Sequence, residues 1–256
     1  MADLLNGQLC LIMGIANKWS LAYAVAEAFS REGARLVLTY AGEQQQSAVE
    51  SLSQNLNVEK LLPCDVTKDD EIVRLGVDLS MLGRPVSAVV HSLAFANRED
   101  LVRPFVETSR EGYLLAQNIS SYSLVAVARA AAPLMTEGGS IMTMSYLGAT
   151  RVVPNYNVMG VAKAALEASV RYLASDLGTA NIRVNAISAG AVKTASARAI
   201  KDFSLLLSTA ADRSPLHRAT EPAEVADAAV FLASPLSRGV TGNVLFVDSG
   251  MHILGI

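Results

Sequence analysis

Residues Ser140 to Ala165 read SIMTMSYLGATRVVPNYNVMGVAKAA. This stretch begins with an apolar run typical of a buried strand, passes through a loop and ends in a segment with helical spacing. Tyr156 and Lys163 are seven residues apart, so a helix would bring both to nearly the same face, together with Met159. A strand followed by such a helix predicts an α/β fold with a catalytic site near the end of the strand. The alternative is that the phenol and the ammonium share an amphipathic helix and no function.

The rest of the chain repeats this alternation of strand and helix. Leu9 to Met13 is continuously apolar, as in a parallel strand that is buried on both faces. Seven strands alternating with helices predict one Rossmann-type α/β domain over residues 1–256, with a doubly wound parallel sheet. Residues 191–214 are rich in small side chains and weakly periodic, so we expect a small substrate-binding lid there. The other strands are expected at 35–40, before Cys64, at 86–90, from Ser140, at 182–187 and from Val244, and helices at 20–32, 43–56, 69–81, 110–135, after Pro154 and at 221–233.

The composition of the 256 residues narrows the possible functions. No apolar run approaches the roughly 18 to 20 residues of a membrane-spanning helix, and the N-terminus lacks a secretory signal. A formal net charge of -3 argues against a nucleic-acid surface. Cys10 and Cys64 are too few for a disulfide framework and fit buried thiols in a reducing compartment. No residues stand at metal-ligand spacing, and His91 has no neighbour in sequence that would orient it as a base. We therefore expect a cytoplasmic protein without a metal.

The first strand ends in a turn of the kind that receives a pyrophosphate. Gly14 follows the strand, and the next helix begins near Ser20, a residue type that caps helices. The free N–H groups of such a helix N-terminus bind phosphate oxygens. Of the expected G-x-G-x-x-G only Gly14 remains, with Ala16 and Ala22 as small neighbours, so a plain strand-to-helix turn is an equal alternative. Asp65 follows a later strand, where it either caps a helix or contacts a cofactor.

These motifs together resemble those of a known family. Similarity to the short-chain dehydrogenase/reductase superfamily covers nearly the whole chain and rests on the Gly14 turn, residues 64–66, 118–120, 185–190 and 247–250, and Tyr156 with Lys163. Within that superfamily the chain resembles the bacterial enoyl-acyl-carrier-protein reductases at residues 14–18, 145–148, 154–160 and 200–203. The match is specific, since members that reduce carbonyls have three residues between Tyr and Lys rather than six.

The resemblance implies hydride transfer from NADH to the β-carbon of a trans-2-enoyl thioester on acyl-carrier protein, the reductive step of type II fatty acid elongation. Negative charge then develops on the thioester oxygen, and Tyr156 is the expected donor to this enolate, in the manner of an oxyanion hole. Lys163 would hold the cofactor ribose and place positive charge near the enolate. Tyr146 is carried over as a second active-site phenol, with an aromatic that merely lines the pocket as an equal alternative.

The resemblance also assigns binding residues. Two departures from the family are Ala191, where Pro is usual, and Trp19, where a basic residue is common. The acyl site is expected to include Ala96, Tyr146, Tyr156, Met159 and Phe203. Cofactor contacts are expected from Gly14, Ser20, Leu21, Asp65, Val66, Leu93, Lys163, Val192, Lys193, Thr194, Ala195 and Ser196.

The segment after the second strand bears on the choice of nicotinamide. Enzymes that use the 2′-phosphorylated cofactor usually place Arg or Lys there, whereas Tyr40 to Gln46 contains one carboxylate, Glu43, and no basic residue. Glu43 or Gln44 would suit a free 2′-hydroxyl. Lys18 in the Gly14 turn is a counter-candidate for a phosphate, but one solvated ammonium contributes about 1 kcal/mol or less. We therefore expect NADH rather than NADPH.

Other features concern partners and alternative functions. Two long helices rich in small residues, with the apolar end 253–256, predict a homotetramer with two-fold axes and no nucleic-acid or membrane partner. A ketoacyl or other carbonyl reductase would share the fold, but it would have the shorter Tyr–Lys spacing and a Ser where Thr143 stands. A non-enzymatic nicotinamide-binding protein would keep the Gly14 turn but would not need two tyrosines and a lysine in one site.

Overall fold

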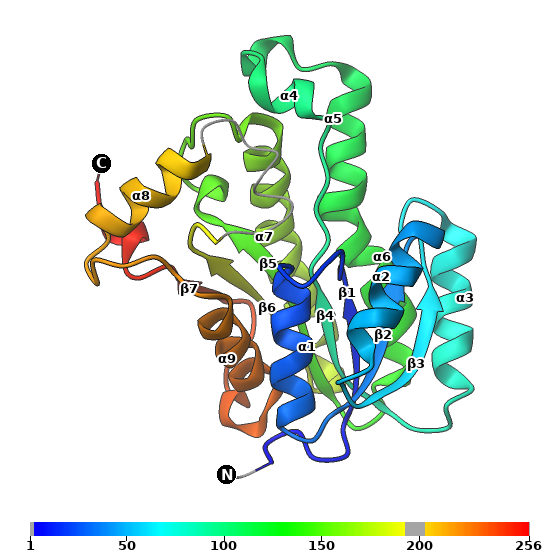
Figure 1. The fold of residues 1–256 in the computed structure, drawn as a ribbon. Coiled ribbons are helices and arrows are strands. Elements are labelled where there is room, and N and C mark those ends of the chain that lie inside the picture. The colour runs from blue at the N-terminus through cyan, green and yellow to red at the C-terminus, as the bar shows by residue number, and fades with distance from the viewer. Residues whose placement is uncertain (1–2, 193–202, 256) are drawn as a thin grey trace.

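The computed structural model describes residues 3–192 and 203–255. Its seven strands form one sheet in the order β3-β2-β1-β4-β5-β6-β7, and every neighbouring pair is parallel (Figure 1). This confirms the doubly wound parallel sheet that the sequence predicts. The strands are β1 (Leu9–Met13), β2 (Arg35–Tyr40), β3 (Val58–Pro63), β4 (Val86–His91), β5 (Gly139–Tyr146), β6 (Ile182–Ala189) and β7 (Val244–Val247).

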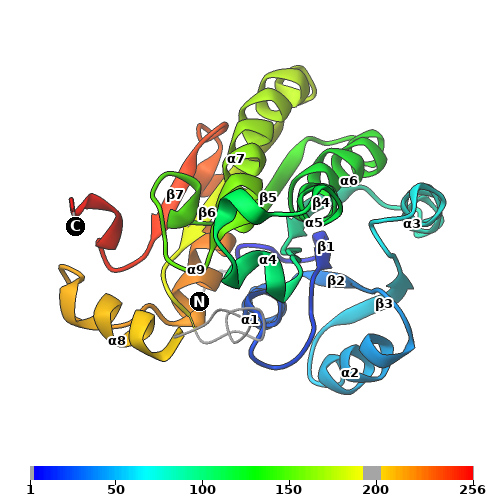
Figure 2. The ribbon, with the colours of Figure 1, turned by 90° about the horizontal axis from the view of Figure 1, so that it is seen from above.

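Helices cover both faces of the sheet (Figures 1 and 2). One face packs against α1 (Leu21–Arg31), α2 (Glu43–Ser53) and α9 (Pro222–Ala233), and the other against α3 (Asp69–Ser80), α6 (Ser123–Ala131) and α7 (Asn157–Leu177). Side chains alternate between the two layers along each strand, so in β1 Cys10 and Ile12 join one core while Leu9, Leu11 and Met13 join the other. Because both layers are apolar, the strands read as continuous apolar runs.

Two segments differ from the simple alternation. The helix expected over 110–135 is helical throughout but divided, because a π-helical turn (Asn118–Tyr122) lies between α5 (Arg110–Gln117) and α6. Such turns insert an extra residue into a helix and occur often at functional sites. With α4 (Arg98–Val102), α5 rises above the carboxyl ends of the strands (Figure 1). The lid expected over 191–214 lies partly outside the described residues, and its later part forms α8 (Phe203–Arg213).

The chain changes direction across the sheet between β1 and β4, and parallel sheets open a ligand crevice at such a point. The N–H of Ser92, after β4, donates to the carbonyl oxygen of Met13 at 3.1 Å. Gly14 has φ +103°, and a Cβ atom there would collide with the Ser92 carbonyl oxygen. Glycine is therefore required at the centre of the crevice. Among the helices of the described ranges, none combines the length and hydropathy needed to cross a membrane.

Candidate active site

A cavity of about 620 Å³ lies at the carboxyl ends of the strands. It brings together residues from β-strand ends, the turn after β1 and helix α7. Of the predicted site residues, Lys193 to Ser196 fall outside the described residues. Phe203 is the first residue of α8, and its side chain also falls outside the described part. The predicted residues that line the cavity are Gly14, Ser20, Leu21, Asp65, Val66, Leu93, Ala96, Tyr146, Tyr156, Met159, Lys163 and Val192.

Tyr156 occupies the junction between a loop and a helix. It is the N-cap residue of α7, so the predicted spacing to Lys163 begins at the first residue of the helix end, and both side chains line the cavity. Asn155 and Asn157, on either side, have positive φ values of 60° and 30°. The Tyr156 carbonyl accepts from the Met159 N–H at 2.9 Å and so starts the helix. Asparagine tolerates this backbone better than most residues, and the Tyr156 side chain between the two asparagines lines the cavity.

The two phenols meet inside the cavity. The rings of Tyr146 and Tyr156 lie edge to face, with centroids 4.9 Å apart. A Cβ atom at Gly148 would collide with the Tyr156 ring, so the glycine leaves room for it. Burial raises the pKa of Tyr146 to about 12 and raises the pKa of Tyr156 well above its ordinary value. Both side chains are therefore protonated hydrogen-bond donors at neutral pH.

Lys163 supplies a buried cation beside these phenols. Its Nζ donates to the carbonyl oxygen of Met144 at 2.6 Å. Burial lowers the pKa of Lys163 to about 8, against the opposing charge of Glu167. Glu167 in turn accepts a hydrogen bond from the buried hydroxyl of Ser145. Ser145 lies in the segment 145–148 that resembles the family but had no predicted role, and Glu167 was not predicted; its one signal in the sequence is that it follows Lys163 by four residues.

The turn after β1 is folded by Ser20. Its Oγ accepts from the N–H groups of Ala16 at 3.0 Å and Asn17 at 3.1 Å, and it makes no capping hydrogen bond to α1. Ser20 is the N-cap residue of α1, as predicted, but its hydroxyl bonds no helix amide because the turn amides take its oxygen. Ser20 and Leu21 line the cavity at the start of α1, where N–H groups lack intrahelical acceptors. This arrangement suits an anionic group.

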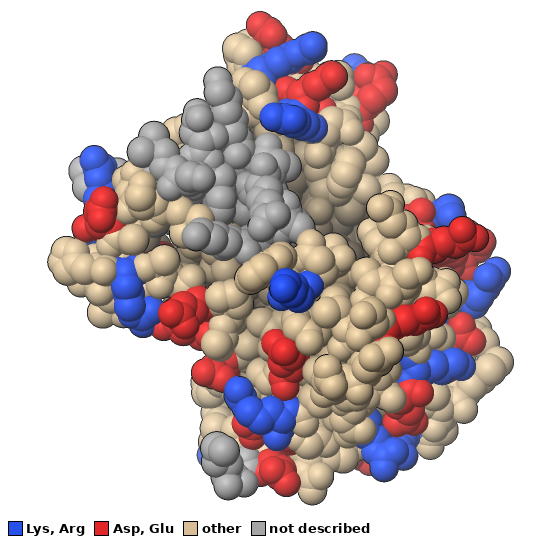
Figure 3. Space-filling view, viewed as in Figure 1, with Lys and Arg blue, Asp and Glu red and all other residues tan. Residues whose placement is uncertain are grey.

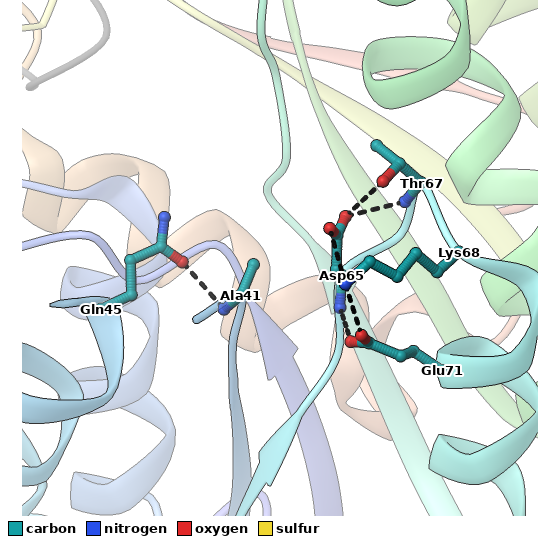
Figure 4. Close-up of polar contacts among 6 residues, drawn as sticks. All are labelled: Ala41, Gln45, Asp65, Thr67, Lys68 and Glu71. Atoms are coloured by element: carbon teal, nitrogen blue, oxygen red, sulfur yellow. Dashed lines mark hydrogen bonds and ion pairs between the residues drawn. The ribbon is translucent and has the colours of Figure 1, made fainter. Parts of the chain in front are cut away.

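The far end of the cavity is polar (Figure 4). On one side the Oε1 of Gln45 accepts from the Ala41 N–H at 2.9 Å. On the other, an Asp65 carboxylate oxygen accepts from the N–H and hydroxyl of Thr67 at 3.0 and 2.7 Å, and Lys68 lies 3.6 Å away. Burial raises the pKa of Asp65, but the Thr67 hydrogen bonds and the Lys68 charge outweigh it, so the pKa falls below its usual value. Lys68 holds the N-cap position of α3, so Asp65 is not the cap and stays an ionised group in the cavity wall.

The residues that face this end differ from those the sequence suggested. Glu43 and Gln44 are exposed and lie outside the cavity wall, whereas Gln45 lines it. Among the described residues that line the whole cavity, Lys163 is the one with a basic side chain. Lys18 lies over an indole ring, 4.9 Å from its centroid, and not in the wall.

His91 is a structural histidine, as its sequence context indicated. Its ring nitrogens lie 2.9 Å from the Thr143 hydroxyl and 2.7 Å from the Ser123 hydroxyl. Burial, with the nearby charge of Lys163, lowers the pKa of His91 to about 3. The imidazole is therefore neutral and fully engaged. Within the described ranges, no group of His, Cys, Asp or Glu side chains is arranged to hold a metal ion.

Known proteins are similar to this chain in sequence and in fold. A family model described as Enoyl-(Acyl carrier protein) reductase matches residues 14–252. The chain is 53% identical to the enoyl-[acyl-carrier-protein] reductase [NADH] FabI of Bacillus subtilis, over 97% of each chain. It is 49% identical to the enoyl-[acyl-carrier-protein] reductase [NADPH] FabI of Staphylococcus aureus, over 98% of each. The crystal structure of the Bacillus cereus enoyl-acyl carrier protein reductase with NADP+ and indole naphthyridinone matches with a TM-score of 0.97, at 52% identity and over 100% of both chains.

Proposed function

The chain belongs to the enoyl-(acyl-carrier-protein) reductase family, and we propose that it reduces trans-2-enoyl thioesters carried by acyl-carrier protein in type II fatty acid elongation. Hydride adds to the β-carbon, the electron pair of the double bond moves toward the thioester oxygen, and a proton is added at the α-carbon. The product is the saturated thioester. The observation that carries this proposal is the edge-to-face pair of phenols, Tyr156 buried and Tyr146 half-buried, in one cavity with the buried ammonium of Lys163.

The cavity fits an extended dinucleotide. Gly14 lets backbone segments approach at the crevice, and the Ser20 turn with the start of α1 suits the phosphates. Asp65 and Val66 line the cavity and are our candidates for the adenine end, and Leu93 is our candidate for the adenosine side. The reduced nicotinamide supplies the hydride when it is bound.

Tyr156 is the group we assign to the developing enolate. Its phenol stays protonated because burial raises its pKa, so it can donate to the thioester oxygen without first losing its proton. One such donor in a dry site contributes about 2.7 to 4 kcal/mol to the transition state. Lys163 adds positive charge in the same cavity and is our candidate for holding the ribose hydroxyls. Tyr146 supports the Tyr156 ring through the edge contact. Ala96, Met159 and, from α8, Phe203 are our candidates for the acyl site.

NADH is the cofactor that we propose in preference to NADPH. The wall near the adenosine end presents Gln45 and the ionised Asp65, while the ammonium of Lys68 lies outside the wall and is paired with Asp65 and Glu71. A 2′-phosphate there would meet like charge from Asp65, while an amide and a carboxylate can both bind a hydroxyl. Relatives of both kinds exist, since one carries NADH and another NADPH in its name.

The assembly we propose is a homotetramer in the cytoplasm. Large apolar side chains stand exposed on the outer helices, including Tyr113 and Leu114 of α5 and Tyr172 of α7. The free, buried thiols of Cys10 and Cys64 suit a reducing compartment. Light scattering at micromolar concentration should give about four times the 27.0 kDa chain mass, and a single-chain mass would refute the assembly.

The binding partner we propose is a carrier-bound acyl chain. On the face drawn in Figure 3, basic side chains are interspersed with acidic ones, so that face offers no broad field of one sign to a polyanion. Recognition of substrate is therefore assigned to the cavity.

The test compares two thioesters with NADH, followed by the nicotinamide absorbance. Crotonyl thioester should be reduced, and acetoacetyl thioester should not. The reverse result would support a carbonyl reductase, and binding of NADH without turnover of either would support a nicotinamide-binding protein.

A further inference from the structure

Ser145 and Glu167 form a buried hydrogen-bonded pair next in sequence to Tyr146 and one helical turn from Lys163. The Ser145 hydroxyl donates to the Glu167 Oε1 at 2.5 Å, and the two residues are 5% and 7% exposed. We propose that Glu167 is a positioning residue for enoyl reduction, an inference that rests on the proposed function. Glu167 fixes the Tyr146 end of β5 through Ser145, and its carboxylate balances the buried charge of Lys163.

The first part of the proposal follows from how α7 is joined to β5. Lys163 Nζ donates to the carbonyl oxygen of Met144, and Glu167 accepts from the next residue, Ser145. The lysine and the glutamate are four residues apart on α7, so they lie one turn apart on one face. These two consecutive attachments secure the strand immediately before Tyr146. Movement of α7 relative to β5 would therefore displace one phenol from the other.

The second part follows from the charges near Lys163. His91 on β4 is neutral, and the phenols of Tyr146 on β5 and Tyr156 at the start of α7 are protonated. Among the described residues, Glu167 is the group whose charge opposes the effect of burial on the Lys163 pKa. Burial alone would make the ammonium lose its proton at a lower pH.

The carboxylate is itself held by its neighbours. Burial raises the pKa of Glu167, and the Ser145 hydrogen bond with the charges of Arg171 and Lys163 limits that rise. Arg171 is exposed one helical turn beyond Glu167, so the face of α7 carries cation, anion and cation in sequence. A buried carboxylate with these partners can keep its charge at the pH where Lys163 titrates.

The two roles can be separated by substitution. Glu167→Gln keeps the size and an acceptor oxygen for Ser145 but removes the charge. Ser145→Ala removes the hydrogen bond and leaves the charge. Asp176→Asn is the matched control, because it removes an exposed carboxylate from the same helix outside the cavity wall.

The experiment measures kcat/KM for NADH with crotonyl thioester from pH 6 to 10, together with the Kd of NADH by fluorescence over the same range. Glu167→Gln should move the alkaline limb of both profiles to lower pH by roughly one unit. Ser145→Ala should lower kcat several-fold without moving the limb, and Asp176→Asn should match the wild type.

Several outcomes would overturn the inference. The proposed role of the carboxylate is refuted if the pH profiles of kcat/KM and NADH affinity in Glu167→Gln coincide with those of the wild type. It is also refuted if the rate falls equally at every pH and the alkaline limb does not move. Glu167→Asp keeps the charge, so it should retain the wild-type limb even if the Gln variant does not fold, and a shifted limb in it also refutes the proposal. The binding profile needs no turnover, so a wild type that binds NADH but reduces no enoyl thioester would contradict the proposed function and not this inference.

Discussion

The rings of Tyr146 and Tyr156 meet edge to face at an interplanar angle of 67°, with 4.9 Å between the centroids. One tyrosine ends a strand and the other precedes a helix, so the contact couples two separate elements at the site. Aromatic pairs of this geometry contribute about 0.5 to 1.5 kcal/mol beyond the burial of their area. The contact thereby limits the positions that the Tyr156 hydroxyl can take.

This contact predicts how Tyr146 acts. Tyr146→Phe keeps the ring and should cost less than about tenfold in kcat, whereas Tyr146→Leu loses the contact and should cost clearly more. Steady-state kinetics with crotonyl thioester at saturating NADH give the comparison. An equal, large loss in both variants would instead identify the Tyr146 hydroxyl as a second essential donor.

Gly148 should be intolerant of any side chain. Gly148→Ala places a Cβ atom against the Tyr156 ring, and the displaced phenol should lower kcat by about ten- to a hundredfold. Gly178→Ala is the control, since a Cβ atom there meets nothing within 4 Å. Kinetics and thermal unfolding of both variants test this, and wild-type kcat in Gly148→Ala would show that the ring position is not constrained.

Lys163 should govern cofactor affinity in a pH-dependent way. Its pKa is lowered to about 8, so the ammonium is present below that pH and is lost as the pH rises through it. NADH binding by the wild type should therefore weaken above about pH 8. Lys163→Ala should bind NADH about ten- to a hundredfold more weakly, because hydrogen bonds from a charged donor contribute about 1.5 to 3 kcal/mol. Fluorescence titration of the variant should show no such alkaline limb; an unchanged limb would assign it to another group.

The adenosine end should discriminate against a phosphate. At fixed crotonyl thioester and low salt, kcat/KM should be higher with NADH than with NADPH, since a 2′-phosphate would approach Asp65. Gln45→Arg should raise the use of NADPH by adding a cation to the wall. Equal or better use of NADPH by the wild type would contradict the preference and direct attention to Lys18.

Local signals predicted most of the fold. The apolar runs of β1 and β4 identify buried parallel strands because both faces of the sheet are covered. Boundaries within long helical segments were less visible. The π-helical turn at Asn118–Tyr122 leaves helical periodicity intact on both sides, so the pattern indicated one helix.

The site was predictable where chemistry follows a motif. Tyr156 and Lys163 carry such a motif, whereas the positive φ values of the two asparagines that flank Tyr156 have no signal in the periodicity of the segment. The contact between Ser145 and Glu167 joins residues 22 positions apart on different elements, and no periodicity specifies it. Gln45 lines the cavity and Glu43 does not, and the composition of that segment does not encode which side chain of α2 turns inward.

The most direct test of the account is the single-turnover rate of NADH oxidation by crotonyl thioester in the wild type and in Tyr156→Phe, with enzyme in excess and circular dichroism to verify the fold. Removal of the one hydroxyl that we assign to the enolate should slow hydride transfer by about a hundredfold or more, with unchanged NADH affinity. Wild-type hydride transfer in a folded Tyr156→Phe variant would contradict the account.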